Sequence, residues 1–395
     1  MTDAVKRSSD DRLKVAIVGC GGIGNSHARG YAASGRADLV GVADIVRERA
    51  DGYAEKYDTT AYGSVTDLLA AQDPALVSIA TPPGTHAELA IEVLAAGKSV
   101  IVEKPPVLSL AELDKIAEAE QASAGSAYGI FQHRHGSGGR RAHQLLQSGA
   151  LGAPLVAVCE TLWFRPRSYF DPDWRGTWVG EGGGPTLGHG IHQIDLLLHL
   201  LGQWKTINAS AVRRDRPVQF EDISMAMVTF ENRAVATMIN SLLSPQELSR
   251  IRIDSEGGTL EVNHLYGYSD ADWTFHPTPD EAVAARLGQD PGTVNPENAA
   301  RSQQAGDAWA ASAAEDVPSN HSAQLGRLVD DLLAGRDHET TLASTRPTME
   351  FITALYASAL TGQAVDRADL VPDHPFYTAL HGGVEQSRID STFAI

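Results

Sequence analysis

The chain has few cysteines, a shortage of basic residues and no long apolar run. Its 395 residues include only Cys20 and Cys159 as cysteines, so we expect two reduced thiols and no disulfide framework. Fifty acidic side chains outnumber 32 basic ones and give a net charge of -18, which repels nucleic acids and anionic lipids. No stretch approaches the roughly 18 apolar residues that span a bilayer, and the opening MTDAVKRSSDDR lacks the apolar region of a signal peptide. We therefore predict a cytoplasmic protein with no nucleic-acid or membrane partner.

Short aliphatic runs alternate with helical stretches in the first third of the chain. The runs are KVAIVG, DLVGVAD, ALVSIA, SVIVEK and AYGIFQ. Such alternation is typical of βαβ units in a parallel sheet that is covered on both faces. We predict an α/β chain whose residues 1–135 form a doubly wound Rossmann domain.

Residues 136–395 follow a second pattern, as the length of the chain leads one to expect. The runs PLVAVCETLWF, SMAMVTFEN, AVATMINSLL and SRIRIDSEGGTLEV contain alternating positions and hairpin signals, which predict an α+β domain with a large, mostly antiparallel open sheet. Helices are expected at 141–148, 189–201, 323–334 and 347–359, and the last could pack back on the first domain. Residues 263–318 have weak periodicity, and we interpret them as a long surface excursion.

A glycine-rich loop follows the first aliphatic run. Gly19, Gly21 and Gly24 form the pattern G-x-G-x-x-G between a predicted strand and a predicted helix, with Gly22 and Ile23 completing the loop. In that context the glycines allow a tight turn, close approach to a pyrophosphate and helix–sheet packing, while the helix N-terminus faces the phosphates. The alternative is a purely structural glycine turn.

An acidic residue accompanies this loop. Asp44 ends the second predicted strand, 20 residues beyond Gly24, where a carboxylate would accept hydrogen bonds from the ribose hydroxyls. Because this charge repels a 2′-phosphate, we predict NAD as the cofactor. Arg47 and Arg49 follow closely, so NADP remains possible.

Two more predicted strands end in candidate site residues. Thr81 and Pro82 lie at the switch-point edge of the sheet, with His86 just beyond them, and we count them as cofactor contacts, although TPPGT could be an ordinary turn. The stretch VIVEKPP places Glu103 and Lys104 at the end of another strand, beside the nicotinamide half of such a cleft, and we predict both as cofactor contacts. A lysine is more often a solvated surface residue.

Several polar residues share one face of the helix expected at 189–201. His189, His192, Asp195 and His199 lie opposite the apolar positions of this helix. A metal site is possible chemically, but the three imidazoles span nearly three turns, and we predict no metal. Satisfied burial accounts for His199, whereas His192 could act as a general base.

The segment before this helix is rich in tryptophan and arginine. Aromatic faces stack on sugars and guanidinium groups donate to hydroxyls or carboxylates, so Arg165 and Trp174 are candidate substrate contacts, together with His189. The alternative places most of these aromatic side chains in the core or at a subunit interface. The residues concerned are Trp163, Phe164, Arg165, Trp174, Arg175 and Trp178. His321, Tyr266 and Trp273 could close over the site.

Together these motifs resemble the glucose-fructose oxidoreductase / inositol dehydrogenase / MocA family. The resemblance is carried by GCGGIGNSHARGY, VADI, SIATPPGTHAELAIEVLAAGKSVIVEKP, GGGPTLGHGIHQIDLL and FITALYASALTGQAV. It implies a Rossmann domain followed by a domain that binds substrate and oligomerises. It also implies that Lys104 hydrogen-bonds the reacting oxygen and that His192 is the catalytic histidine. The family often has an aspartate four residues before this histidine, where this chain has Gly188; His189 or Asp195 could partly compensate.

The sequence thus predicts an NAD-dependent dehydrogenase or reductase. Its substrate would be a ring carbinol of a sugar, anhydrosugar, inositol or related cyclic polyol, and the resemblance implies a homodimer or homotetramer. Two alternatives use the same loop: an NAD-dependent glycosidase that oxidises its sugar transiently, and a non-catalytic NAD-binding sugar sensor. The presence of both Lys104 and His192 disfavours the sensor.

Overall fold

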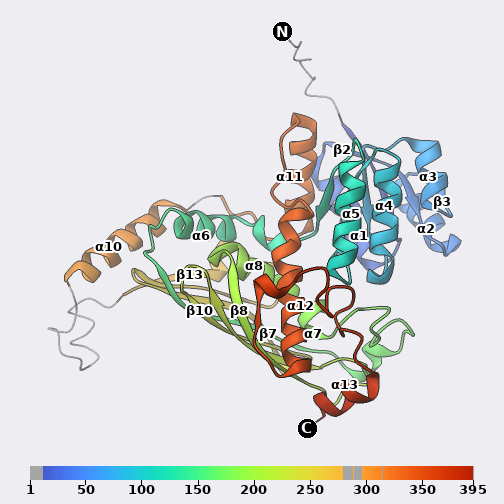
Figure 1. Ribbon diagram of the computed structural model, residues 1–395. Helices are drawn as coiled ribbons and strands as arrows, with labels where there is room; N and C mark the ends of the chain where they lie inside the picture. Colours follow the sequence, from blue (N-terminus) through green and yellow to red (C-terminus); the bar gives the residue numbers. More distant parts are fainter. Residues whose placement is uncertain (1–11, 279–287, 289–295, 314, 395) are drawn as a thin grey trace. The chain divides into compact units, whose positions relative to one another are not determined.

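The computed structural model describes residues 12–278, 288, 296–313 and 315–394, and its elements are labelled in Figure 1. The chain divides into two compact units. Unit 1 contains residues 1–107, 112–130 and 321–345, and unit 2 contains 108–111, 131–320 and 346–395. Among the described helices, none combines the length and the apolar character needed to cross a bilayer.

Unit 1 is built on a parallel sheet of six strands, which confirms the predicted Rossmann domain. The strand order is β3-β2-β1-β4-β5-β6, so β2 and β3 lie on one side of β1 and β4 to β6 lie on the other. Doubly wound sheets bind ligands at this switch point between β1 and β4. The strands are β1 (Leu13–Val18), β2 (Ala37–Ala43), β3 (Ala61–Tyr62), β4 (Leu76–Ile79), β5 (Ser99–Val102) and β6 (Ala127–Gly129). The helices are α1 (Gly22–Ser34), α2 (Arg47–Tyr57), α3 (Val65–Gln72), α4 (His86–Ala95) and α11 (His321–Ala334), with most of α5 (Leu110–Gln121).

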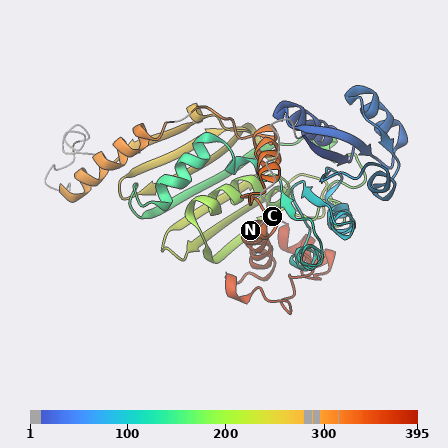
Figure 2. The same ribbon diagram turned by 90° about the horizontal axis from the view of Figure 1, so that it is seen from above.

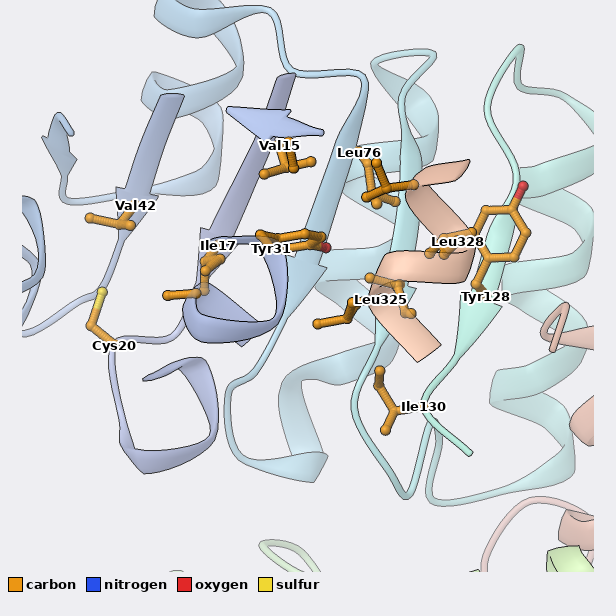
Figure 3. Packing of buried hydrophobic residues seen from close by; sticks show 14 of the residues in the cluster. Val15, Ile17, Cys20, Tyr31, Val42, Leu76, Tyr128, Ile130, Leu325 and Leu328 are labelled. Atoms are coloured by element: carbon orange, nitrogen blue, oxygen red, sulfur yellow. The ribbon is translucent and has the colours of Figure 1, made fainter. Parts of the chain in front are cut away.

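Helix α11 comes from late in the chain and completes the core of unit 1. Its Leu325 and Leu328 are fully buried in one cluster with Val15, Ile17 and Tyr31 (Figure 3). A Cβ atom on Gly30 of α1 would lie 2.8 Å from Leu325 Cδ1, so the glycine permits close packing of α1 against α11. Burial of these side chains holds α11 on the sheet, at roughly 1.5–3 kcal/mol for each large aliphatic group.

Unit 2 is built on an eight-stranded sheet of order β13-β12-β11-β7-β10-β9-β8-β14. Among the described strands of this sheet, β7 and β10 alone pair in parallel, so the predicted large, mostly antiparallel sheet is confirmed. The strands are β7 (Pro154–Phe164), β8 (Trp204–Val212), β9 (Ile223–Phe230), β10 (Val235–Ser241), β11 (Leu243–Ser255), β12 (Gly258–His264), β13 (Trp273–Pro277) and β14 (Val365–Asp366).

Helices cover one face of this sheet. Figure 2 shows α6 (Ser137–Gln147) and α8 (Ile191–Leu201) side by side on that face, and α12 (Arg346–Thr361) packs against β8. Along β9 buried and exposed residues alternate, as expected for a strand with one covered face. Unit 2 also contains α7 (Pro185–Gly188), α10 (Pro296–Ala311) and α13 (Gln386–Phe393). Short 3-10 turns are η1 (Pro83–Thr85) and η6 (Ala343–Thr345) in unit 1, and η2 (Gln132–Arg134), η3 (Arg167–Phe170), η4 (Asp270–Asp272) and η7 (Arg367–Asp369) in unit 2.

The structure differs from the sequence predictions at several boundaries. The helix expected at 189–201 begins two residues later, at Ile191, and a separate short helix, α7, ends just before the expected start. The first unit includes residues 321–345 beyond the predicted boundary at 135, while α12, expected at 347–359, lies in unit 2.

The predicted surface excursion at 263–318 contains regular structure. Trp273 begins the edge strand β13 and is only 5% exposed. Its indole lies where a Cβ atom on Gly138 would fall, 2.3 Å from Cδ1. Helix α10 follows, while residues 279–287 and 289–295 of the predicted excursion lie outside the described residues. A five-residue edge strand is too short to produce a clear period in the sequence.

Candidate active site

The glycine loop of unit 1 has the geometry that a dinucleotide requires. Gly19 has a φ of +101°, and a Cβ atom there would lie 2.5 Å from the Ala80 carbonyl oxygen. A Cβ atom on Gly24 would lie 2.1 Å from the Gly19 carbonyl oxygen, so both positions demand glycine. At Gly21 and Gly22, by contrast, a Cβ atom would meet nothing within 4 Å. The loop is therefore tight on its protein side and open on its outer side.

Helix α1 begins at this open side. Its N-cap, Gly21, forms no side-chain cap, and the first turn contains no acidic residue. The N–H groups of the first turn have no partner within a helix, and the helix dipole is positive at this end. These residues therefore fit a pyrophosphate.

We predict that Gly19→Ala lowers stability much more than Gly22→Ala does. Gly19→Ala should lower the free energy of unfolding by about 1–3 kcal/mol, because alanine is strained at positive φ and meets the Ala80 carbonyl. Gly22→Ala should change it by less than about 0.5 kcal/mol, because the added methyl group meets no protein atom. Urea denaturation followed by circular dichroism measures both values. Equal losses in the two variants would contradict this account of the loop.

Asp44 lies beside the loop at the end of β2. One carboxylate oxygen accepts the Cys20 N–H at 2.8 Å and the other accepts the Val46 N–H at 2.8 Å. The carboxylate is only partly buried, and each oxygen retains a further lone pair. Asp44 can therefore accept hydrogen bonds from a ribose while it holds the loop. The exposed Arg47 side chain pairs with Asp51 within α2.

Side-chain contacts hold the turn that follows β4. Thr81 Oγ1 lies 2.8 Å from Thr85 Oγ1, and Pro82 caps η1. His86 is 1% exposed, and its ring nitrogens lie 2.9 Å from the Thr81 carbonyl oxygen and 2.8 Å from the Pro105 carbonyl oxygen. His86 thus ties this turn to the Glu-Lys-Pro turn, and burial lowers its pKa.

The Glu-Lys-Pro turn places two different side chains at the end of β5. Lys104 is half-buried, whereas Glu103 is 4% exposed. The peptide between Lys104 and Pro105 is cis. Glu103 Oε2 accepts the N–H of Lys104 at 3.0 Å, and Glu103 Oε1 lies 2.9 Å from His27 Nε2 and 2.7 Å from His321 Nε2. Glu103, predicted as a cofactor contact, is occupied by protein partners.

In unit 2, His192 lies in the first turn of α8 among aromatic rings. It is 2% exposed, and its ring centroid lies 5.0 Å from that of His133 and 5.4 Å from that of Tyr266. Tyr266 is 39% exposed and its hydroxyl accepts a hydrogen bond from Gln132 Nε2 at 2.6 Å. Of the residues that sequence reasoning proposed as covers, Tyr266 therefore contacts His192. Trp273 packs in the core of unit 2, and His321 belongs to unit 1.

His133 is a residue that sequence reasoning missed. It is 2% exposed, lies in η2 and also packs against Tyr268, with ring centroids 4.8 Å apart. The available signal was its place in FQHRH, directly after a predicted strand.

His189 occupies the break between α7 and α8. Its Nε2 accepts a hydrogen bond from Arg165 Nε at 3.2 Å, and its ring lies 5.0 Å from that of Trp163. Since guanidinium only donates, this bond assigns the ring proton of His189 to Nδ1. Arg165 also donates to Glu247 at 3.0 Å. Trp174 is half-buried and packs against the guanidinium of Arg175, 4.3 Å from its ring centroid.

Asp195 is engaged by structural partners. Arg134 Nε donates to Oδ2 at 2.7 Å, Arg134 Nη2 donates to Oδ1, and Thr348 Oγ1 donates to Oδ1 at 2.9 Å. The side chain is fully buried, and burial raises the pKa of Asp195 although Arg134 opposes this. These hydrogen bonds tie Asp195 to η2 and α12, and its part in orienting His192 in place of the usual aspartate stays a prediction.

The remaining histidine of this face, His199, stacks on His143 with ring centroids 3.9 Å apart. Burial lowers the pKa of His199 to about 2, so its ring is neutral, and the interpretation of His199 as a satisfied buried side chain stays a prediction. The histidines of this face thus contact different neighbours. Within the described ranges, the set of side chains close enough to share a metal ion lies in unit 1 and consists of His27, Glu103 and His321.

Comparison with known proteins gives the family. The model described as "Oxidoreductase family, NAD-binding Rossmann fold" matches residues 13–127, and the model of the "GFO/IDH/MocA C-terminal domain" matches 140–261. UDP-N-acetylglucosamine 3-dehydrogenase of Acidithiobacillus ferrooxidans is 32% identical over 255 residues, covering 64% of this chain and 74% of the relative. The chain belongs to the GFO/IDH/MocA oxidoreductase family. This confirms the resemblance, and it establishes an oxidoreductase with an NAD-binding Rossmann domain.

Other relatives have related names. D-glucoside 3-dehydrogenase of Escherichia coli is 27% identical over 280 residues, covering 64% of this GFO/IDH/MocA chain and 78% of the relative. Inositol 2-dehydrogenase of Salmonella typhimurium is 36% identical over 149 residues, covering 36% of this chain and 44% of the relative. Among solved structures, WlbA dehydrogenase of Bordetella pertussis in complex with NADH and UDP-GlcNAcA has a TM-score of 0.75 at 22% identity and covers 90% of this chain and 98% of its own. At that identity the likeness concerns the fold.

Proposed function

We propose that this GFO/IDH/MocA oxidoreductase moves a hydride between NAD and a ring carbinol of a sugar, anhydrosugar, inositol or related cyclic polyol. The observation that carries the proposal is the open glycine loop with Asp44 beside it, in a chain that also presents Lys104 at the end of β5. The names of the relatives support the substrate class, because they are dehydrogenases of glucosides, a UDP-sugar and inositol.

The cofactor would be held by unit 1. The backbone at Gly21 and Gly22 and the N-terminus of α1 would receive the pyrophosphate, and Asp44 would receive the ribose hydroxyls. Ile23, Thr81 and Pro82 would line the same edge. When bound, the nicotinamide ring supplies the acceptor or donor of the hydride. Because the Asp44 carboxylate repels a 2′-phosphate, the proposal specifies NAD over NADP.

The chemistry assigned to the protein side chains is acid–base and electrostatic. His192 would accept the hydroxyl proton as the carbinol is oxidised, since a neutral imidazole is a suitable base near neutral pH. The Lys104 ammonium would donate a hydrogen bond to the same oxygen as negative charge develops on it. Arg165, Trp174 and His189 remain candidate substrate contacts, through guanidinium donation and stacking on sugar C–H faces.

Activity screening tests the proposal. Inositols, pyranoses, anhydrosugars and sugar acids would each be incubated with NAD or NADP while NADH or NADPH absorbance is followed and products are analysed. We expect net reduction of NAD by at least one cyclic polyol, with NADP less effective. Release of a free sugar without net cofactor reduction would favour the glycosidase. Cofactor binding without turnover of any compound would favour the sensor.

We also propose that unit 2 forms a homodimer or homotetramer through the open face of its sheet. Large apolar side chains are exposed there on neighbouring strands, at Val156, Met225, Met227 and Val235, with exposed fractions of 44%, 48%, 69% and 45%. Apolar exposure on one face favours association.

Substitution on this face should change the mass of the protein in solution. The double variant Met225→Glu, Met227→Glu should be monomeric by light scattering while the unchanged protein is oligomeric, because burying two carboxylates in an apolar contact is costly. Val371→Glu, at another exposed apolar position of unit 2 (51% exposed), is the control and should keep the wild-type mass. An unchanged mass in the double variant would contradict the assignment of this face.

A cytoplasmic location stays a prediction. Both cysteines are buried and free.

A further inference from the structure

In unit 1, the buried carboxylate of Glu103, the residue before Lys104, has two imidazole partners. Glu103 Oε1 is 2.9 Å from His27 Nε2 and 2.7 Å from His321 Nε2. The three residues are 4%, 0% and 9% exposed. His27 belongs to α1, and His321 is the first residue of α11, 218 residues after Glu103 in the sequence.

The negative charge of Glu103 is buried, so neighbouring groups must balance it. Desolvation alone would raise the pKa of Glu103, but the charge of His321 and the hydrogen bonds from both imidazoles hold it well below its usual range. The carboxylate is therefore ionised in the interior of unit 1. A buried ion persists only where its partners supply charge or hydrogen bonds.

The two histidines are held differently. His27 Nδ1 lies 2.9 Å from Ser78 Oγ, which in turn lies 2.6 Å from the Tyr31 hydroxyl. Burial lowers the pKa of His27, so this imidazole acts chiefly through its hydrogen bonds. His321 is the more exposed of the two, and its Nε2 lies 2.7 Å from Glu103 Oε1. His321 is therefore the member that links α11 to the carboxylate.

The Glu103 carboxylate also binds the backbone of the turn that carries Lys104. Glu103 Oε2 accepts the backbone N–H of Lys104 at 3.0 Å, while the backbone N–H of Glu103 donates to the Ile79 carbonyl at 2.9 Å. Ionised carboxylate accepts strongly from an N–H group, and protonation of Oε2 would weaken this bond. The chain His321–Glu103–Lys104 N–H thus connects α11 to the backbone that carries the Lys104 side chain.

We propose that His321 is a positioning residue for the reaction, which through Glu103 fixes the backbone of Lys104 at the end of β5. The inference rests on the proposed role of Lys104 in catalysis. The charged or titratable groups around Glu103 are His27 from α1, His86 from α4, His321 from α11 and Lys104 beside it. Because His27 remains in place, loss of His321 should leave the carboxylate present but easier to protonate.

Three variants of the full chain test this inference. His321→Leu removes the donor to Glu103, and His321→Gln restores an N–H donor that cannot titrate. His338→Gln is the matched control: His338 is also buried in unit 1 and pairs with a carboxylate, Asp331, at 2.9 Å. Hydrogen exchange of the Lys104 amide is measured by mass spectrometry without added cofactor, and kcat and KM are measured at neutral pH on the best substrate from the screen.

The expected result has three parts. His321→Leu should speed exchange of the Lys104 amide by about tenfold at neutral pH, the effect of one weakened bond to a charged acceptor. Its kcat should fall, because the backbone that carries the Lys104 side chain is held less firmly at the reacting oxygen. His321→Gln should recover most of the exchange protection, and His338→Gln should match the unchanged protein in both measurements.

Two results would overturn the inference. One is equal behaviour of His321→Leu and His338→Gln, which would indicate a general effect of losing a buried pair. The other is one equivalent of zinc in the purified protein that is lost in His321→Leu, which would make the cluster a metal centre. Failure of the proposed role of Lys104 is separable, because wild-type turnover in Lys104→Ala would refute that role while exchange of the Lys104 amide in the unsubstituted protein and in His321→Leu still reports on the contact.

Discussion

Replacement of Lys104 or His192 by alanine is expected to lower kcat by about two orders of magnitude or more. Without Lys104, no ammonium group stabilises the negative charge on the reacting oxygen. Without His192, the hydroxyl proton has no positioned acceptor. Both side chains are assigned to the reacting oxygen and not to the dinucleotide loop, so the dissociation constant for NADH should change little. Steady-state kinetics and NADH fluorescence titration give the two quantities.

Controls for these variants come from exposed residues of the same kinds. Lys205→Ala on β8 and His276→Ala on β13 remove an exposed lysine and an exposed histidine of unit 2. Both should keep wild-type turnover. Unchanged kcat in Lys104→Ala and in His192→Ala would refute the assignment, and a parallel loss of NADH binding would place these residues in cofactor binding instead.

Replacement of Asp195 by alanine is expected to lower the free energy of unfolding of unit 2 by about 3–5 kcal/mol. The substitution leaves the Arg134 guanidinium, with a side chain 8% exposed, buried without its carboxylate partner. The double variant Arg134→Met, Asp195→Leu should recover most of this loss, because apolar side chains can replace a buried pair. Urea denaturation followed by tryptophan fluorescence measures the change.

An exposed ion pair provides the comparison. Arg36 and Asp330 are 2.6 Å apart in unit 1, with side chains 43% and 48% exposed, and Asp330→Ala should cost less than about 1 kcal/mol. If Asp195→Ala also cost less than 1 kcal/mol, the buried pair would not be a structural element. If its folded form lost as much turnover as His192→Ala, Asp195 would be the carboxylate that orients His192.

Local patterns made the Rossmann domain predictable. Each strand of unit 1 is a short aliphatic run, and the glycine loop is read within a single stretch of sequence. The structure supplies the reason for two of its glycines, since Gly19 and Gly24 each lack room for a Cβ atom. The end of β2 also fixed the place of Asp44. Such features depend on neighbouring residues, so the sequence contains their signal.

Features that depend on distant segments were not predictable. Helix α11 was expected as a helix, but its apolar face does not specify which sheet it covers. The contact of His321 with Glu103 depends on that placement. The start of α8 was placed two residues early because His189 shares the helical spacing of His192. The bond from Arg165 to His189 requires knowledge of where β7 ends. Asp195 shared a face with His192 in the sequence pattern, yet its partners Arg134 and Thr348 come from η2 and α12.

The measurement that tests the central claim most directly is a crystal structure of the protein with NADH. Our account places the pyrophosphate on the backbone of Gly21 and Gly22 at the N-terminus of α1, with the adenosine ribose on Asp44. It places the nicotinamide so that a carbinol carbon about 3–3.5 Å from the ring can have its oxygen bonded by Lys104 and His192. A dinucleotide bound elsewhere, or a nicotinamide ring from which both side chains point away, would contradict it.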